Sequence, residues 1–257
     1  MDAVPVVTFA EGDLPASSRR VFEALGDLAA EVPIDRWCLI GGLMVEVILR
    51  SRGRSPLRPT DDGDVVGDVR ADRAILATIS EALRRASFEL VETGMGGEFG
   101  VRHRRGDGTT IDLLAPENRT RNVEPPRPGF ELLAAPGAEQ ALLTAAPIRI
   151  DLAGERDVVL RVPSLTGALF AKTTAWKELV ASPDRSKHLN DAAQLLVAAN
   201  LDDLMVLADG PIPPKALRRR WRWLQEALSD RRATGWGDVP MEDRAPALQR
   251  LAIVLSS

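Results

Sequence analysis

Two neighbouring stretches of the chain decide the fold: Trp37-Cys38-Leu39-Ile40-Gly41-Gly42 and Arg58-Pro59-Thr60-Asp61-Asp62-Gly63-Asp64-Val65-Val66. The first predicts a buried strand that runs into a glycine pair at the start of a helix. The second predicts another strand, with carboxylates at alternate positions. Because residues two apart on a strand face the same side, we expect Asp62 and Asp64 to lie next to each other. Like charges this close repel, so the pattern indicates a divalent cation between them.

The alternative is that residues 61–68 form only an acidic turn, and the Asp-x-Asp pattern alone does not decide between the two. The glycine pair favours a site, because glycines let backbone N–H groups approach a ligand and a helix N-terminus attracts an anion such as a triphosphate. A tight turn without a ligand is the alternative for Gly41 and Gly42.

A third carboxylate, Asp112, lies on a predicted strand over 109–114. If that strand lies beside the first, three carboxylates meet on one face, and such oxygen ligands predict one or two Mg²⁺ ions. Two metal ions can activate an attacking hydroxyl and neutralise a leaving pyrophosphate.

The composition predicts a globular protein of one or two domains, with 257 residues, 45% hydrophobic and 27% charged. Cys38 is the only cysteine and no apolar run approaches a membrane span, so we expect a soluble protein of the reducing cytoplasm. A net charge of −4 argues against general coating of nucleic acid, but it allows a local basic groove.

Hydrophobic periodicity predicts an α+β fold with a boundary near Val162. Residues 1–162 are expected to form an α/β domain with a mixed sheet, and residues 163–257 a helical domain. The predicted helices are about 17–31, 42–50, 71–86, 164–181, 184–200, 213–229 and 242–255. The further predicted strands are 88–92, 98–103, 148–152 and 158–162.

At its glycine and aspartate motifs the chain resembles the nucleotidyltransferases of the polymerase-β-like superfamily, and most closely the AbiEii type, to which the MenT toxins are related. The family pattern of a strand, Gly-Gly, a helix and Arg-x-Thr/Ser-x-Asp-x-Asp matches residues 40–42 and 58–64. The resemblance implies a nucleotidyltransferase fold in which Asp62, Asp64 and Asp112 hold two Mg²⁺ ions. It also implies that Asp112 helps to deprotonate the acceptor hydroxyl and that Gly41, Gly42 and Thr60 bind the NTP.

The helical half carries a second similarity to this family, a lysine helix followed by a Lys-Asp-x-x-Asp helix. Lys172 and Asp191 match it, whereas His188 stands where the family has the first Asp. A second departure is Leu43, which follows the glycines where the family has Ser or Thr. The resemblance implies that Lys172 contacts phosphate and that Asp191 belongs to the catalytic set.

Lys172 is also conspicuous without the resemblance, because it interrupts an apolar helical stripe: Leu165, Leu169, Trp176 and Leu179. The stripe predicts a cation turned inward towards phosphate, oriented by Asp191. The alternatives are a lysine stem that snorkels at the edge of the core, and for Asp191 a surface pair with Lys187.

A basic and aromatic run over 218–223 offers a possible RNA contact through Arg219, Arg222 and Trp223. A solvated helix face is the favoured alternative, and helical spacing predicts that Trp221 belongs to the core. The two histidines, His103 and His188, are too few to predict a zinc site. The glycines at 94–97 are expected to form a turn.

These observations lead to the hypothesis of an Mg²⁺-dependent nucleotidyltransferase that transfers NMP from an NTP to an acceptor hydroxyl. The resemblance implies a toxin with a cognate antitoxin and with tRNA or another RNA as acceptor. One alternative is a small-molecule transferase of the aminoglycoside-modifying type. Another is a nucleotide-binding or interaction protein that has lost catalysis, which the departures at Leu43 and His188 favour.

Overall fold

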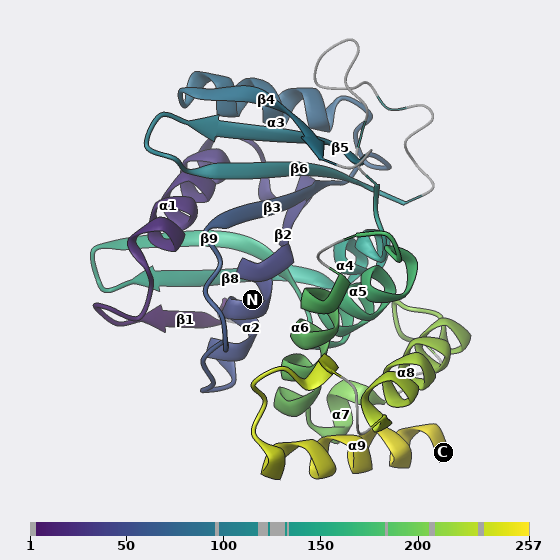
Figure 1. Ribbon diagram of the computed structural model, residues 1–257. Helices are drawn as coiled ribbons and strands as arrows, with labels where there is room; N and C mark the ends of the chain where they lie inside the picture. The colour runs from purple at the N-terminus through teal and green to yellow at the C-terminus, as the bar shows by residue number, and fades with distance from the viewer. Residues whose placement is uncertain are drawn as a thin grey trace.

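A computed structural model of the protein describes residues 4–95, 98–117, 123, 132, 134–182, 185–205, 209–230 and 234–256. The chain has an α+β fold, with strands in its first part and helices in its last part (Figure 1). The predicted fold class is therefore confirmed. The proline-rich stretch at 125–128 and the last glycines of the 94–97 cluster lie outside the described residues.

The main sheet has the strand order β2-β3-β6-β5-β4, with β7 beside β6. Its strands are β2 (Trp37–Ile40), β3 (Asp62–Gly67), β4 (Phe88–Met95), β5 (Glu98–Arg105), β6 (Thr110–Pro116) and β7 (Ala134–Ala135). β3 pairs with β6 in parallel, whereas β2 with β3, β4 with β5 and β5 with β6 are antiparallel. The sheet is mixed, as the sequence predicts.

One face of this sheet packs on α1 (Ala16–Glu31) and α3 (Ile75–Arg85). The helices approach so closely that a Cβ atom on Gly63 would lie 2.7 Å from Val21 Cγ1, and one on Gly67 2.7 Å from Leu76 Cδ2. Because side chains alternate along a strand, residues 62 and 64 must point to the other face. Packing of the odd-numbered positions thus turns both carboxylates away from the core.

A second sheet has the order β1-β8-β9 and contains the predicted hairpin. Its strands are β1 (Val6–Phe9), β8 (Ala145–Leu152) and β9 (Arg156–Pro163). β1 was not predicted, because a four-residue strand shows little alternation and pairs with β8 far along the chain. The short helix α4 (Ala138–Thr144) was missed for the same reason of length.

The helical part begins directly after β9, where Ser164 Oγ accepts a hydrogen bond from Gly167 N and caps α5. Its helices are α5 (Leu165–Glu178), α6 (Arg185–Ala198), α7 (Leu201–Leu204), α8 (Pro214–Ser229) and α9 (Met241–Ser256). Trp221 of α8 is fully buried, which confirms its predicted place in the core. No helix in the described ranges is long and apolar enough to cross a membrane.

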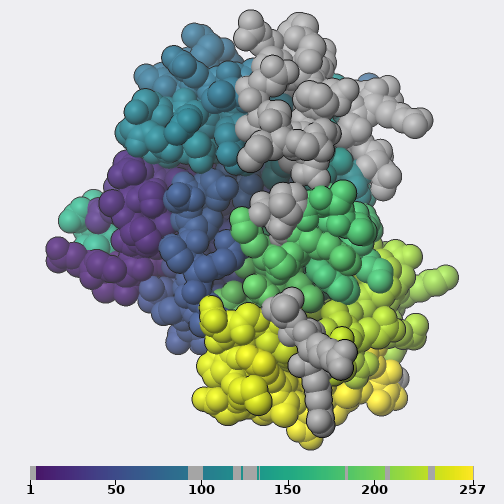
Figure 2. Space-filling model, viewed as in Figure 1, coloured from purple at the N-terminus to yellow at the C-terminus, as the bar shows by residue number. Residues whose placement is uncertain are grey.

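α5 and α6 pack against α2 (Gly41–Ser51), so the helical part covers the helix that follows the glycine pair. In Figure 2 the purple-to-teal part of the chain and the green-to-yellow part meet side by side across the visible face. The change from strands to helices after Pro163 lies next to the predicted boundary, which stays a prediction as a division between domains.

Candidate active site

Asp64, Asp112 and Arg102 lie side by side on three neighbouring strands of the main sheet, because these strands are in register. Asp64 of β3 is the partner of Asp112 of β6, and Asp112 is the partner of Arg102 of β5. Paired residues on neighbouring strands point to the same face, and Asp62, two residues before Asp64, points there too. We call Asp62, Asp64 and Asp112 the acidic row. The structure thus brings together the three predicted carboxylates.

The glycine pair lies against the acidic row at the N-terminus of α2. Gly41 is the first residue of this helix and has φ of +73°, and a Cβ atom there would overlap the Asp64 carboxylate. A Cβ atom on Gly42 would lie 2.7 Å from Thr60 Oγ1. Both glycines are therefore required by close approach, and the approach places the positive end of a helix dipole beside Asp64.

Burial and repulsion raise the pKa of the Asp64 carboxyl to about 7. Desolvation is the largest cause, followed by the charges of Asp62 and Asp112, while Lys172 and Arg102 act in the opposite direction. A carboxyl in this state is stabilised by any further positive charge. The binding of a divalent cation by the row stays a prediction.

The cation that touches the row in this structure is Arg102. Its Nε and Nη2 donate hydrogen bonds to the two carboxylate oxygens of Asp112, at 2.7 and 2.6 Å, and Nη2 lies 3.8 Å from Asp62 Oδ2. Arg102 was not predicted as a site residue, because only the register of β5 against β6 places it opposite Asp112. An arginine on the strand next to a predicted acid was the available signal.

The row has the oxygen donors that Mg²⁺ prefers, but its present arrangement does not fit a three-carboxylate metal site. Both oxygens of Asp112 accept from Arg102, and one oxygen of Asp62 accepts from Thr60 Oγ1 at 2.8 Å. Within the described residues, no group of three or more His, Cys, Asp or Glu side chains is arranged to hold a metal ion.

Thr60, predicted to bind nucleotide, is buried and orients Asp62 through this hydrogen bond. Its backbone carbonyl accepts a hydrogen bond from the buried hydroxyl of Ser18 in α1. The loop that leads into β3 is therefore fixed from both the backbone and the side chain of Thr60. A direct contact of Thr60 with nucleotide stays a prediction.

Lys172 and Asp191 form a buried ion pair between α5 and α6. Lys172 Nζ lies 2.7 Å from Asp191 Oδ2, and the residues are 5% and 2% exposed. Burial excludes the snorkelling alternative for Lys172 and the surface pair of Asp191 with Lys187, so both of those interpretations are wrong. The structure shows Lys172 paired with Asp191, while the role of this lysine in binding phosphate stays a prediction.

Arg58 joins this pair from the loop before β3. Its Nη2 donates to both oxygens of Asp191, each at 3.0 Å. In the same loop, Leu57 N donates to Gln194 Oε1 at 2.8 Å. Two residues of α6, Asp191 and Gln194, therefore hold the loop that leads into the strand with Asp62 and Asp64. The sequence alone did not indicate this role for Arg58.

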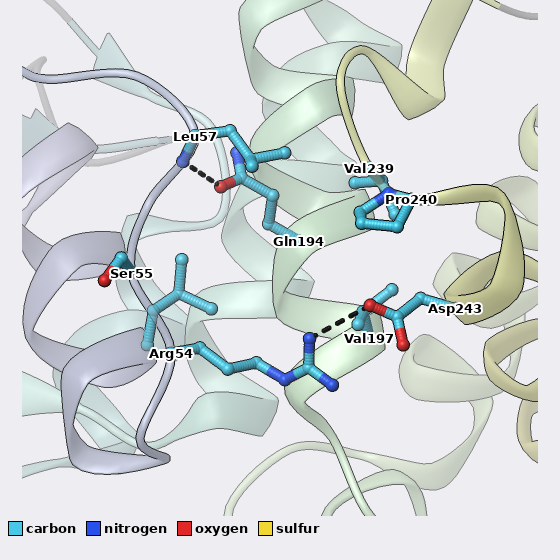
Figure 3. Close-up of a pocket in the computed structure, with 9 residues that line it drawn as sticks. Arg54, Ser55, Leu57, Gln194, Val197, Val239, Pro240 and Asp243 are labelled. Carbon is cyan, nitrogen blue, oxygen red and sulfur yellow. Dashed lines mark hydrogen bonds and ion pairs between the residues drawn. The ribbon is translucent and has the colours of Figure 1, made fainter.

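Two small pockets lie where this loop meets α6. One is next to the glycine pair and is lined by Gly42, Val45, Pro56, Arg58, Thr60, Asp191 and Gln194. Figure 3 shows the other, where Gln194 accepts from Leu57 and Arg54 pairs with Asp243 at 3.1 Å across the gap between the loop and α9. The first pocket lies next to the N-terminus of α2.

The two departures from the family pattern have different surroundings. Leu43 is completely buried, and its side chain is part of the hydrophobic core. His188 lies in α6, one turn before Asp191, and is half-buried. Burial gives a structural reason for an apolar residue at position 43.

Exposed cationic side chains lie around the half-buried ring of Trp223, in the basic run on α8. Arg219 and Arg222 are exposed, and Arg219 and Lys177 lie over the Trp223 ring at 5.2 and 5.5 Å. A contact with RNA stays a prediction, since a solvated helix face has the same exposure.

His103 lies on β5, on the face opposite Arg102, and it is buried. Burial lowers the pKa of its imidazole to about 4, and Nε2 is 2.7 Å from Ser80 Oγ. The neutral ring is therefore packed against α3 and does not face the acidic row.

Comparison with known proteins bears on the fold. No family model matches the chain, and no curated protein sequence matches it. Among solved structures it is similar to the crystal structure of an antigenic nucleotidyltransferase-like protein from Paracoccidioides brasiliensis, with a TM-score of 0.52 and 16% sequence identity. The match covers 95% of this chain and 99% of the other. The chain has a nucleotidyltransferase-like fold. The match extends over both the sheet and the helical part, and it does not distinguish the AbiEii type.

Proposed function

We propose that the protein is a nucleotidyltransferase that transfers NMP from an NTP to an acceptor hydroxyl. The observation that carries this proposal is the position of the acidic row against the N-terminus of α2. Carboxylates for general base chemistry and backbone N–H groups for phosphate binding lie on the two sides of one small region.

In this proposal the backbone at Gly41 and Gly42 binds the triphosphate. Lys172 supplies positive charge from the helical part, and this charge lowers the pKa of Asp64. The acceptor oxygen forms a bond to the α-phosphorus, the bond to the β-phosphate breaks, and pyrophosphate leaves. A carboxylate of the row, Asp112 by resemblance, takes the proton of the acceptor hydroxyl.

We further propose Mg²⁺ as the cofactor, held by Asp62, Asp64 and Asp112 once Asp112 is free of Arg102. The ion would supply charge neutralisation for the phosphates. Asp191 acts on Lys172, because it is the buried partner that fixes the position of the ammonium group.

For the acceptor we propose RNA, with tRNA as the first candidate. The exposed Arg219 and Arg222 and the cations around Trp223 support this choice, because arginine and aromatic side chains bind phosphates and unpaired bases. A toxin with a cognate antitoxin, acting in the cytoplasm, is a further proposal that depends on the resemblance to AbiEii proteins.

The test uses α-labelled NTPs with Mg²⁺ and total cellular RNA, and separately with protein and aminoglycoside acceptors. We expect label in RNA with the wild-type protein and none with Asp64→Asn. The matched control is Asp61→Asn, which removes an exposed carboxylate three residues earlier. Label in an aminoglycoside alone would favour the small-molecule transferase. NTP binding without transfer to any acceptor would favour the protein that has lost catalysis.

A further inference from the structure

Arg102 occupies the place where a cation would bind the acidic row. Its guanidinium forms a bidentate pair with Asp112 and lies 3.8 Å from Asp62. The pair is built into the sheet, since Arg102 and Asp112 are register partners on antiparallel strands. The arrangement thus follows from the sheet and does not depend on a chance surface rotamer.

Arg102 differs from the other cations near the row in what it contacts. Lys172 and Arg58 both donate to Asp191, which satisfies the charge of that carboxylate. Arg102 instead donates to the row itself, and the acids raise the pKa of its guanidinium further. An arginine cannot lose its charge here, so it leaves Asp112 only by moving.

We propose that Arg102 is a positioning residue that competes with a divalent cation for Asp112. This inference rests on the proposed function, because it concerns how the same site takes up its metal. A metal ion that uses all three carboxylates needs an Asp112 oxygen, and both oxygens accept from Arg102. A metal ion at Asp112 would lie beside the guanidinium charge, so we expect metal binding to turn the guanidinium away. Its side chain is 35% exposed, so a path towards solvent is open.

The competition makes metal uptake depend on what can hold the displaced guanidinium. A triphosphate offers bidentate acceptors to arginine and further oxygen ligands to the metal. Metal and nucleotide are therefore expected to bind together more readily than the metal alone. The resting site would then stay closed to free divalent ions while no NTP is present.

The experiment measures Mn²⁺ binding to the whole protein without nucleotide, by electron paramagnetic resonance and by calorimetry. We expect Arg102→Met to bind Mn²⁺ about tenfold or more tightly than the wild type, because a charge-assisted bidentate competitor is removed. Arg102→Lys, which keeps the charge but loses the planar fork, is expected to lie between them.

The matched control is Arg104→Met, on the same strand and two residues further on. Arg104 is exposed and is the register partner of Thr110, not of an acid of the row. Arg104→Met removes the same charge from the same face of the sheet but leaves the Arg102–Asp112 pair in place. Mn²⁺ affinity is therefore expected to stay within about twofold of the wild type. Circular dichroism checks folding, and if Arg102→Met does not fold, Arg102→Lys provides the comparison.

The variant Asp64→Asn separates failure of this inference from failure of the proposed function. If wild type and Arg102→Met bind Mn²⁺ equally and Asp64→Asn abolishes binding, the row holds metal without competition and only the inference is overturned. If neither the wild type nor Arg102→Met binds Mn²⁺, or if Asp64→Asn has no effect on binding, the row is not a metal site. The inference and the proposed function are then both overturned.

Discussion

Lys172 Nζ lies 2.7 Å from Asp191 Oδ2, and this ion pair between two helices is almost fully buried. Arg58, from the loop before β3, donates to the same carboxylate. Asp191 therefore links the helical part of the chain to the strand that carries Asp62 and Asp64. Its charge orients the lysine that we propose for phosphate binding.

Asp191→Asn is expected to lower the free energy of unfolding by about 3–5 kcal/mol, because Lys172 is left buried without a carboxylate. Urea unfolding measures the change. The control is Glu81→Gln, which removes an exposed carboxylate paired with Arg84 and should change stability much less. A loss no larger than that of the control would show that the buried pair does not stabilise the fold.

Gly41→Ala should be more destabilising than Gly53→Ala, although both glycines have positive φ, +73° and +68°. An alanine at Gly53 meets no atom within 4 Å, so only backbone strain of about 1–2 kcal/mol is expected. At Gly41 the added Cβ also overlaps the Asp64 carboxylate, which adds about 1–3 kcal/mol. Equal losses in thermal or urea unfolding would contradict the close approach of α2 to the acidic row.

Leu43→Ser should not create a phosphate contact, because residue 43 is buried in the core. We expect a loss of about 3–5 kcal/mol from the cavity and the buried hydroxyl, with no gain in NTP affinity. Leu143→Ser, the same change at a leucine that is 42% exposed, is the control and should have a small effect. Tighter NTP binding by Leu43→Ser would show that position 43 faces the ligand.

Asp64→Asn should change how stability depends on pH in the presence of a chelator. Burial raises the pKa of Asp64 to about 7, so between about pH 4 and pH 7 the folded state keeps a proton that the unfolded chain releases. The free energy of unfolding of the wild type therefore falls as pH rises through this window. The variant should be more stable than the wild type at pH 8 and nearly equal to it at pH 4. Parallel pH profiles would mean that Asp64 ionises normally in the folded protein.

Local sequence patterns determined the elements and part of the site. Alternation placed Asp62 and Asp64 on one face, and the odd positions around them, such as Gly63 and Val65, are buried on the other. The apolar stripe of α5 placed Lys172 on an inward face. These features repeat every two or 3.6 residues, so neighbours in the chain specify them.

Tertiary structure fixed the register and docking by which distant residues meet. The register of β5, β6 and β3 set Arg102 opposite Asp112 and Asp112 opposite Asp64, and the packing of α6 on the loop before β3 brought Arg58 to Asp191. Strand order, register and helix docking depend on the whole core, and a short window of sequence does not encode them. The sequence therefore determined that Asp62 and Asp64 share one strand face and that the glycine pair begins a helix. Only the folded chain decided that Arg102, an arginine of the same sheet, pairs with Asp112.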